Sequence, residues 1–164
     1  MNRKIFEWSV RFFERSKNAR KTLRLIYSFL PFTLLIAYPA LLVYAAFTMQ
    51  DKLLRLVLVP LCVFVGVTLL RVVINETRPY EKYGKPSVFR KSTAGKSFPS
   101  RHTASAFIIA MTFFYVSVPF GTAAMTVALL VAASRVLSGA HYLHDVLTGA
   151  AIGIVSGQIF FFMI

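Results

Sequence analysis

Only two residues with a full charge, Arg135 and Asp145, occur in the last 63 residues of the chain. Charged residues make up 15% of the whole sequence, whereas a soluble domain usually has about 25%. A segment so poor in charge cannot cover itself with a water-exposed surface, but it can face lipid hydrocarbon. The sequence therefore predicts a single membrane domain.

The apolar runs are long enough for about five transmembrane helices, since one crossing needs about 20 residues. The predicted spans cover roughly residues 24–47, 53–74, 102–119, 122–138 and 146–164. Residues 75–101 break this pattern with cations, Pro, Gly and Ser, so we expect a polar loop there at one membrane face. The predicted fold is an all-α polytopic membrane helix bundle over residues 24–164.

The first 23 residues carry too many charges to cross a bilayer. Ile5, Trp8 and Phe12 recur at helical spacing among Arg and Lys residues. This pattern is typical of a basic amphipathic helix that lies in the membrane interface, and a frayed basic tail is the alternative.

The net charge of +13 raises the question of a nucleic-acid partner. The cations flank long apolar runs, a distribution that favours anionic lipid headgroups instead. We therefore expect the bilayer and a membrane lipid as partners, no nucleic acid, and no obligatory protein partner.

Five crossings place four polar segments on one side of the membrane: the end of the second span, the start of the third, the end of the fourth and the start of the fifth. Charged groups close to a membrane core are costly and by default indicate function. An isolated Arg at a helix end commonly extends to the interface without any such role, so the interpretation depends on the whole set. Its members are Arg71, Arg78, Ser100, Arg101, His102, Arg135, His141, His144 and Asp145.

These residue types indicate phosphoryl transfer. Several converging guanidinium groups favour a tetrahedral oxyanion, which Arg binds with forked hydrogen bonds. His141 lies four residues before Asp145, so one ring N–H can reach the carboxylate while the other nitrogen attacks. His144 competes for the same carboxylate, and His102 could donate a proton to a leaving oxygen. Since the chain has no cluster of carboxylates for Mg²⁺, we expect neither a metal nor another cofactor, with Arg supplying the positive charge.

Three short motifs in this region resemble those of the type-2 phosphatidate phosphatase superfamily of lipid phosphate phosphatases. That family carries Lys-x6-Arg-Pro, Pro-Ser-Gly-His and Ser-Arg-x5-His-x3-Asp. The chain reads Arg71-x6-Arg78-Pro79, Pro99-Ser100-Arg101-His102 and Ser134-Arg135-x5-His141-x3-Asp145. The resemblance covers roughly residues 53–157 with order and spacing kept.

The resemblance implies a role for each matching residue. His141 would attack phosphorus, oriented by Asp145, and His102 would protonate the leaving group. His144 falls outside the motif, which favours a non-catalytic role for it. The residues implied in phosphate binding are Arg71, Arg78, Ser100 and Arg135.

The chain departs from the family pattern at two motif positions. Arg71 replaces Lys, and Arg101 replaces Gly and could add a phosphate contact. Family members also commonly have six spans, and here the interfacial helix stands in place of the first.

The distribution of cations predicts the orientation in the membrane. Residues 1–24 alone contain eight Lys or Arg, on the same side as the motifs. The positive-inside rule then gives a multi-pass cell-membrane protein with its active site on the cytoplasmic face, whereas the family more often acts on the outer face.

The predicted function is metal-independent hydrolysis of a lipid phosphate or diphosphate through a phosphohistidine. Polyprenyl (undecaprenyl) diphosphate is the favoured substrate, with phosphatidylglycerophosphate and phosphatidate as alternatives. The non-enzymatic alternative is an anionic-lipid-binding or channel-like membrane protein. Vanadate-dependent haloperoxidases share similar motifs, but their soluble character fits this chain poorly.

Overall fold

The computed structural model describes residues 3–91 and 93–163, and all regular structure within them is helical. Predictions that fall on residues 1, 2, 92 and 164 lie outside the described residues. The helices are α1 (Arg3–Arg15), α2 (Lys17–Thr48), α3 (Gln50–Ile74), α4 (Pro79–Lys82), α5 (Arg101–Val116), α6 (Val118–Leu137) and α7 (Leu143–Gly157). The last helix continues as a π-helical segment, Gln158–Met163. The predicted all-α helix bundle is confirmed.

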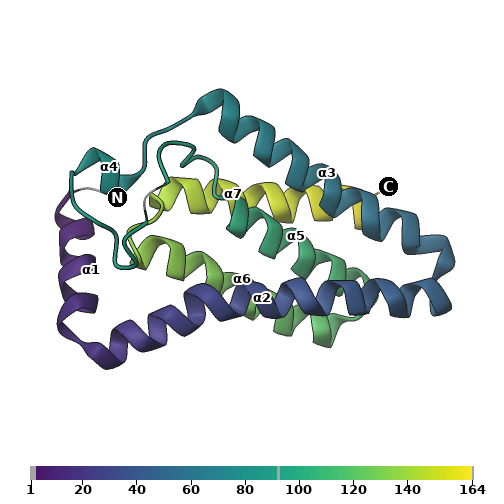
Figure 1. The fold of residues 1–164 in the computed structure, drawn as a ribbon. Coiled ribbons are helices and arrows are strands. Elements are labelled where there is room, and N and C mark those ends of the chain that lie inside the picture. Colours follow the sequence, from purple (N-terminus) through teal and green to yellow (C-terminus); the bar gives the residue numbers. More distant parts are fainter. Residues whose placement is uncertain (1–2, 92, 164) are drawn as a thin grey trace.

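Five long helices run alongside one another in alternating directions, while α1 lies across one end of the bundle (Figure 1). The starts of α2, α5 and α7 and the ends of α3 and α6 meet at that end, together with α4 and the loop around it. The sequence-predicted convergence of the four polar segments is thus present in the fold.

Within residues 3–91 and 93–163, four stretches are long and apolar enough to cross a membrane: Lys17–Thr48, Gln50–Lys82 (α3 together with α4), Val118–Leu137 and Leu143–Met163. The fifth bundle helix, α5, has 16 residues and is about 24 Å long, shorter than the hydrocarbon core of about 30 Å. It occupies the centre, packed against α3, α6 and α7. Because its neighbours shield it, α5 does not need the length of a lipid-facing span.

The amphipathic helix ends earlier than its predicted range of 1–23. Helix α1 stops at Arg15, and Ser16 caps the next helix by accepting a hydrogen bond from the backbone N–H of Ala19 at 3.3 Å. Serine is a favoured N-cap because its hydroxyl satisfies an otherwise unpaired N–H. The basic residues from Lys17 onward therefore form the first turns of the long helix α2.

Three glycines of α7 bring it close to α5. A Cβ built on Gly149 would lie 2.7 Å from the backbone oxygen of Ser100, and one on Gly153 would lie 2.9 Å from that of Ala104. A Cβ on Gly157 would meet the side chain of Met111. The predicted close packing along this glycine face is confirmed.

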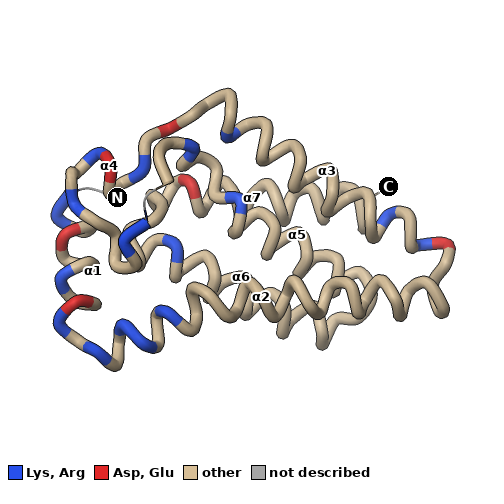
Figure 2. The backbone as a smooth tube through the Cα atoms, viewed as in Figure 1, with Lys and Arg blue, Asp and Glu red and all other residues tan. Residues whose placement is uncertain are grey.

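The charged residues gather at the end of the bundle that carries α1, α4 and the loop (Figure 2). The opposite end offers Asp51, Lys52 and Arg55. This asymmetry leaves one end of the bundle as the place where polar chemistry can occur.

Candidate active site

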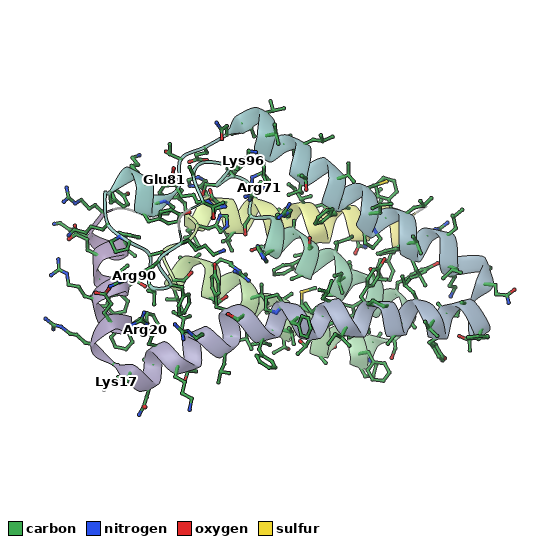
Figure 3. The ribbon with its side chains drawn as sticks, in the orientation of Figure 1. Lys17, Arg20, Arg71, Glu81, Arg90 and Lys96 are labelled. Atoms are coloured by element: carbon green, nitrogen blue, oxygen red, sulfur yellow. The ribbon has the colours of Figure 1, made fainter. Side chains whose placement is uncertain are left out.

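Arg71, in the last turn of α3, holds the polar loop against the bundle. Its guanidinium donates to the backbone oxygens of Ser97 at 3.3 Å and Pro99 at 2.7 Å. Figure 3 shows the side chain directed from α3 toward this loop. The loop segment that leads into α5 is therefore anchored beside the end of α3.

Arg78 connects the loop to the α6–α7 connection. Its side chain is buried, with Nε donating to the backbone oxygen of Gly95 at 3.0 Å and Nη1 to that of Ala140 at 3.4 Å. The backbone N–H of Arg78 donates to the Glu81 carboxylate at 2.8 Å, which starts helix α4. The guanidinium is thereby held in one orientation next to His141.

Arg135, in the last turn of α6, is 2% exposed and packs on helix α2. Its Nη2 donates to the backbone oxygen of Tyr27 at 2.9 Å, and its guanidinium carbon lies 3.9 Å from the centre of the Tyr27 ring. Among the described residues its Nε has no hydrogen-bond partner. A buried guanidinium with a spare donor is suited to binding an oxyanion.

His141 and Asp145 form the central pair of the site. Nδ1 of His141 donates to Oδ2 of Asp145 at 3.2 Å, and the two side chains are 4% and 0% exposed. The same oxygen accepts the backbone N–H of Tyr142 at 3.0 Å and the hydroxyl of Ser97. Three donors fix the carboxylate, which in turn fixes the imidazole and leaves Nε2 as the nitrogen available for attack.

Burial lowers the pKa of His141 from 6.5 to about 4. The hydrogen bond to Asp145 opposes this change, while the positive charges of Arg78 and Arg71 add to it. The imidazole is therefore neutral near pH 7. A neutral imidazole retains the lone pair that a nucleophile needs.

His144 contacts the other oxygen of the same carboxylate. Its Nε2 lies 2.9 Å from Oδ1 of Asp145 and 3.2 Å from Oε1 of Glu76, and its ring stacks on Tyr142. The two histidines therefore do not exclude each other, because each uses a different oxygen. The side chain of His144 is 52% exposed, so it lies at the rim of the site.

The ligand atoms of Glu76, His144 and Asp145 lie within 4.8 Å of one another, a spacing that could hold a metal ion. The three residues differ in exposure, since Asp145 is fully buried and His144 faces outward. Oδ2 of the Asp145 carboxylate is bonded to His141, whereas Oδ1 is the oxygen that lies near His144.

The second motif forms the start of α5. The backbone N–H of Ser100 donates to the backbone oxygen of Asp145 at 2.9 Å, and its buried hydroxyl accepts from Thr103 at 2.9 Å. The guanidinium of Arg101 lies 5.3 Å from the ring centre of Phe64 on α3. The His102 side chain is exposed.

An apolar cavity of about 610 Å³ lies between α2, α3 and α5 and reaches Arg101 and His102. The remaining lining is largely aliphatic or aromatic, with Leu35, Leu61 and Phe64 among its members. A cavity of this character, open between helices that face lipid, is suited to a hydrocarbon chain whose polar end lies at the motifs.

The structure brings the three motifs together and adds residues that sequence reasoning missed. Ser97 bonds Asp145, and Tyr27 supports Arg135, although neither lies in a motif. Ser97 falls in the predicted polar loop 75–101, and Tyr27 falls in the predicted span 24–47. Nothing in their local sequence distinguishes them, because their contacts are with residues far along the chain.

A family model described as the PAP2 superfamily matches residues 52–164 of this chain. The chain is also 39% identical over 83 residues to a lipid A 1-phosphatase of Porphyromonas gingivalis. That similarity covers 48% of this chain but only 18% of the length of the relative.

Two solved structures have the same fold. Aquifex aeolicus LpxE is similar with a TM-score of 0.62 and 25% sequence identity, over 85% of this chain and 92% of that one. A transmembrane PAP2 type phosphatidylglycerolphosphate phosphatase from Bacillus subtilis gives a TM-score of 0.67 at 22% identity, over 96% of this chain and 81% of that one.

Proposed function

Because the chain belongs to the PAP2 superfamily, we propose that it is a metal-independent phosphatase that removes phosphate from a membrane lipid. The observation that carries the proposal is the buried His141–Asp145 pair beside the guanidiniums of Arg71 and Arg78. A neutral histidine with a fixed tautomer next to several positive groups is the arrangement that a phosphohistidine mechanism needs.

In the first step, Nε2 of His141 attacks phosphorus and forms the N–P bond while the bond to the lipid oxygen breaks. His102 gives its proton to that oxygen, so the lipid leaves as a neutral alcohol or, from a diphosphate, as a monophosphate. Arg71, Arg78 and Arg135 hold the phosphoryl oxygens, with Ser100 and Arg101 at the start of α5 as further contacts.

In the second step, water attacks the phosphorus of the phosphohistidine. His102, now neutral, takes a proton from the water, and the N–P bond breaks to release inorganic phosphate and free His141. Asp145 keeps Nδ1–H oriented and stabilises the positive imidazole that forms on attack. The charge that a metal supplies in other phosphatases comes here from guanidinium groups.

The substrate is a lipid because the second motif, through Arg101 and His102, borders the apolar cavity between α2, α3 and α5. The hydrocarbon enters sideways from the bilayer, and the phosphate reaches the motifs at its polar end. The activities named for the relatives add a lipid A 1-phosphate to the three lipids that the sequence favours. We place it first in the test, ahead of polyprenyl diphosphate, phosphatidylglycerophosphate and phosphatidate.

The experiment is release of inorganic phosphate by the purified protein in detergent with EDTA, measured on these four lipids. Wild type, His141→Ala and His144→Ala are compared, and acid-stable and acid-labile phosphoenzyme are separated after rapid quenching. We expect release by wild type and His144→Ala, none by His141→Ala, and an acid-labile phosphoenzyme typical of phosphohistidine.

Release that requires an added divalent cation would contradict the metal-free mechanism. Equal rates for His141→Ala and wild type would assign the nucleophile elsewhere. A folded protein that releases phosphate from none of the four lipids would favour the anionic-lipid-binding or channel-like alternative. The relative rates among the four lipids identify the substrate class.

We also propose that the active site faces the cytoplasm, since the charged end of the bundle carries the cations of α1 and the start of α2. The test uses Ala94→Cys in the loop and Gln50→Cys at the opposite end, both in a Cys62→Ser background. A membrane-impermeant thiol reagent on intact cells should label position 50 and not position 94. The reverse pattern would place the site on the outer face.

A further inference from the structure

Helix α1 does more than lie beside the bundle, because one of its faces is packed on the segment that carries the nucleophile. Phe6, Val10 and Phe13 are buried against α2, α4 and the polar loop. The hydroxyl of Ser9 donates to the backbone oxygen of Leu137, the last residue of α6. This face therefore touches the start of the α6–α7 connection, four residues before His141.

The same connection has a second contact with α1. Gly139 has a φ of +71°, and a Cβ built on it would lie 2.6 Å from the ring of Phe6. The next backbone N–H groups, of Ala140 and His141, both donate to the carbonyl of Arg135 at 3.2 Å. The Phe6 ring thus closes over the turn that aligns Arg135 with His141.

A second face of α1 is apolar but is not covered by protein. Trp8 is 61% exposed and Phe12 is 47% exposed, and their rings stack with centres 5.5 Å apart. At about 100° per residue, these two side chains lie within about 40° of each other, and the exposed Ile5 lies between them and the buried Ser9 around the helix. The apolar surface of α1 is therefore wider than the part that the bundle covers.

Cations border this uncovered strip. Lys4, Arg11 and Arg15 line a shallow depression together with Trp8 and Phe12. Aromatic rings at the boundary between hydrocarbon and headgroups, next to Lys and Arg, are typical of a helix seated in an anionic membrane surface. Helix α1 lies across the end of the bundle where the apolar helices α2, α5 and α7 begin (Figure 1).

We propose that α1 is a membrane-seated clamp: its Trp8–Phe12 face rests in an anionic lipid surface, and its Phe6–Ser9 face holds the α6–α7 connection. The partner of the outer face is the bilayer interface itself, chosen over a protein partner because cations and aromatic rings alternate there. Binding of α1 to anionic lipid thereby orders the turn at residues 138–141, which carries His141. The membrane contact does not depend on the proposed enzyme activity, whereas its catalytic consequence does.

Trp8 is the only tryptophan of the chain and so reports directly on α1. The full-length protein is placed in nanodiscs of phosphatidylcholine, with or without phosphatidylglycerol, whose acyl chains carry bromine near the headgroup or near the chain end. We expect Trp8 fluorescence to be quenched more by the shallow bromines, and more strongly with phosphatidylglycerol. No quenching in either lipid would overturn the proposal.

A matched control moves the probe to the charged face. In the double variant Trp8→Phe, Glu14→Trp, the tryptophan replaces an exposed residue outside the depression, so it should face water and show little quenching. Equal quenching at both positions would mean that α1 has no preferred face toward the lipid, and would also overturn the proposal.

The clamp is tested by amide hydrogen exchange at residues 138–141 in the same nanodiscs. Exchange there should slow when phosphatidylglycerol is present, and Phe6→Ala should remove that difference while leaving exchange in α5 unchanged. Unaltered exchange at this turn in both lipids would refute the coupling. Neither measurement requires catalysis, so failure of the proposed function and failure of the clamp give different results.

Discussion

Helix α5 packs against α6 and α7 far more closely than α2 and α3 pack against each other. Gly149 and Gly153 of α7 leave no room for a Cβ against the backbone of α5, whereas a Cβ on Gly66 of α3 would meet nothing within 4 Å. A cavity of about 610 Å³ separates α2 and α3 from α5. The half of the bundle formed by α5, α6 and α7 is thus the close-packed half, and the half formed by α2 and α3, which borders the cavity, is the open half.

The two halves supply different parts of the candidate site. His102, Arg135, His141 and Asp145 all come from the close-packed half and its connection. The open half contributes Arg71, the Tyr27 support for Arg135 and most of the cavity lining. Reacting groups need fixed positions, while a hydrocarbon chain needs space, and the packing follows this division.

The largest effect should come from the close-packed half, at Asp145. Asp145→Asn keeps the shape of the side chain but removes the charge that selects the Nδ1–H tautomer of His141. We expect the rate of phosphate release to fall by about 10³–10⁴-fold. Glu76→Gln, which alters the exposed partner of His144, is the matched control and should change the rate less than about threefold. Similar losses of phosphate release in both variants would contradict the separate roles of His141 and His144.

A second prediction concerns a variant that disrupts the close contact between α5 and α7. Gly149→Val places a branched side chain where a Cβ alone lies 2.7 Å from the oxygen of Ser100. Overpacking costs about 1–3 kcal/mol, and a displacement of about 1 Å at a catalytic group can reduce the rate about hundredfold. Thermal unfolding and phosphate release measure the two effects. Gly66→Val should leave the thermal stability and the rate of phosphate release unchanged. Equal losses in Gly66→Val and Gly149→Val would contradict the difference in packing between the two halves.

A third prediction concerns the support that α2 gives to Arg135. Tyr27→Leu removes the ring beneath the guanidinium, and a desolvated cation–π contact is worth about 2 kcal/mol. We expect vanadate, as a phosphate analogue, to bind about tenfold more weakly. Tyr27→Phe keeps the ring and should bind as wild type, because in the described part of the chain the Tyr27 hydroxyl has no hydrogen-bond partner. Weak binding by both variants would assign the effect to the hydroxyl instead.

A smaller effect is expected from the open half. Leu61→Trp narrows the cavity and should raise the KM for long-chain lipids several-fold while leaving the rate with a short-chain phosphate unchanged. Leu69→Trp changes the same helix at an exposed position outside the cavity lining and serves as its control. A loss that does not depend on chain length would show that the tail lies elsewhere.

The smallest expected effect is that of mild acid on the protonation of His141 and, through it, on the stability of the folded protein. Because its pKa in the folded protein is about 4 rather than 6.5, the imidazole stays neutral from pH 7 to pH 5. The unfolded chain takes up that proton as pH falls from about 6.5 to 4, so this group makes the folded protein less stable relative to the unfolded one over that window. NMR titration of labelled histidine in detergent, assigned with His102→Gln and His144→Gln, measures the value. A midpoint near 6.5 for His141 would contradict its burial.

The overall architecture could be predicted because it follows from local sequence properties. Uninterrupted apolar runs of about 20 residues must become helices in lipid, since no other conformation of a single segment satisfies the backbone there. The order of those runs alone decides that Arg71, His102, Arg135 and His141 share one end of the bundle. The motif spacings and the glycine repeat of α7 likewise require no knowledge of distant contacts.

The tertiary structure decided the features that join segments far apart along the chain. His141 and His144 are both within reach of Asp145 by sequence, and only the path of the connection assigns them to Oδ2 and Oδ1. Ser97 reaches the same carboxylate through the fold of the loop. Helix α1, expected to rest in the interface, is also packed on the α6–α7 connection through Phe6 and Ser9. Local spacing fixes which residues can meet along one helix, but contacts between helices depend on how the whole chain packs.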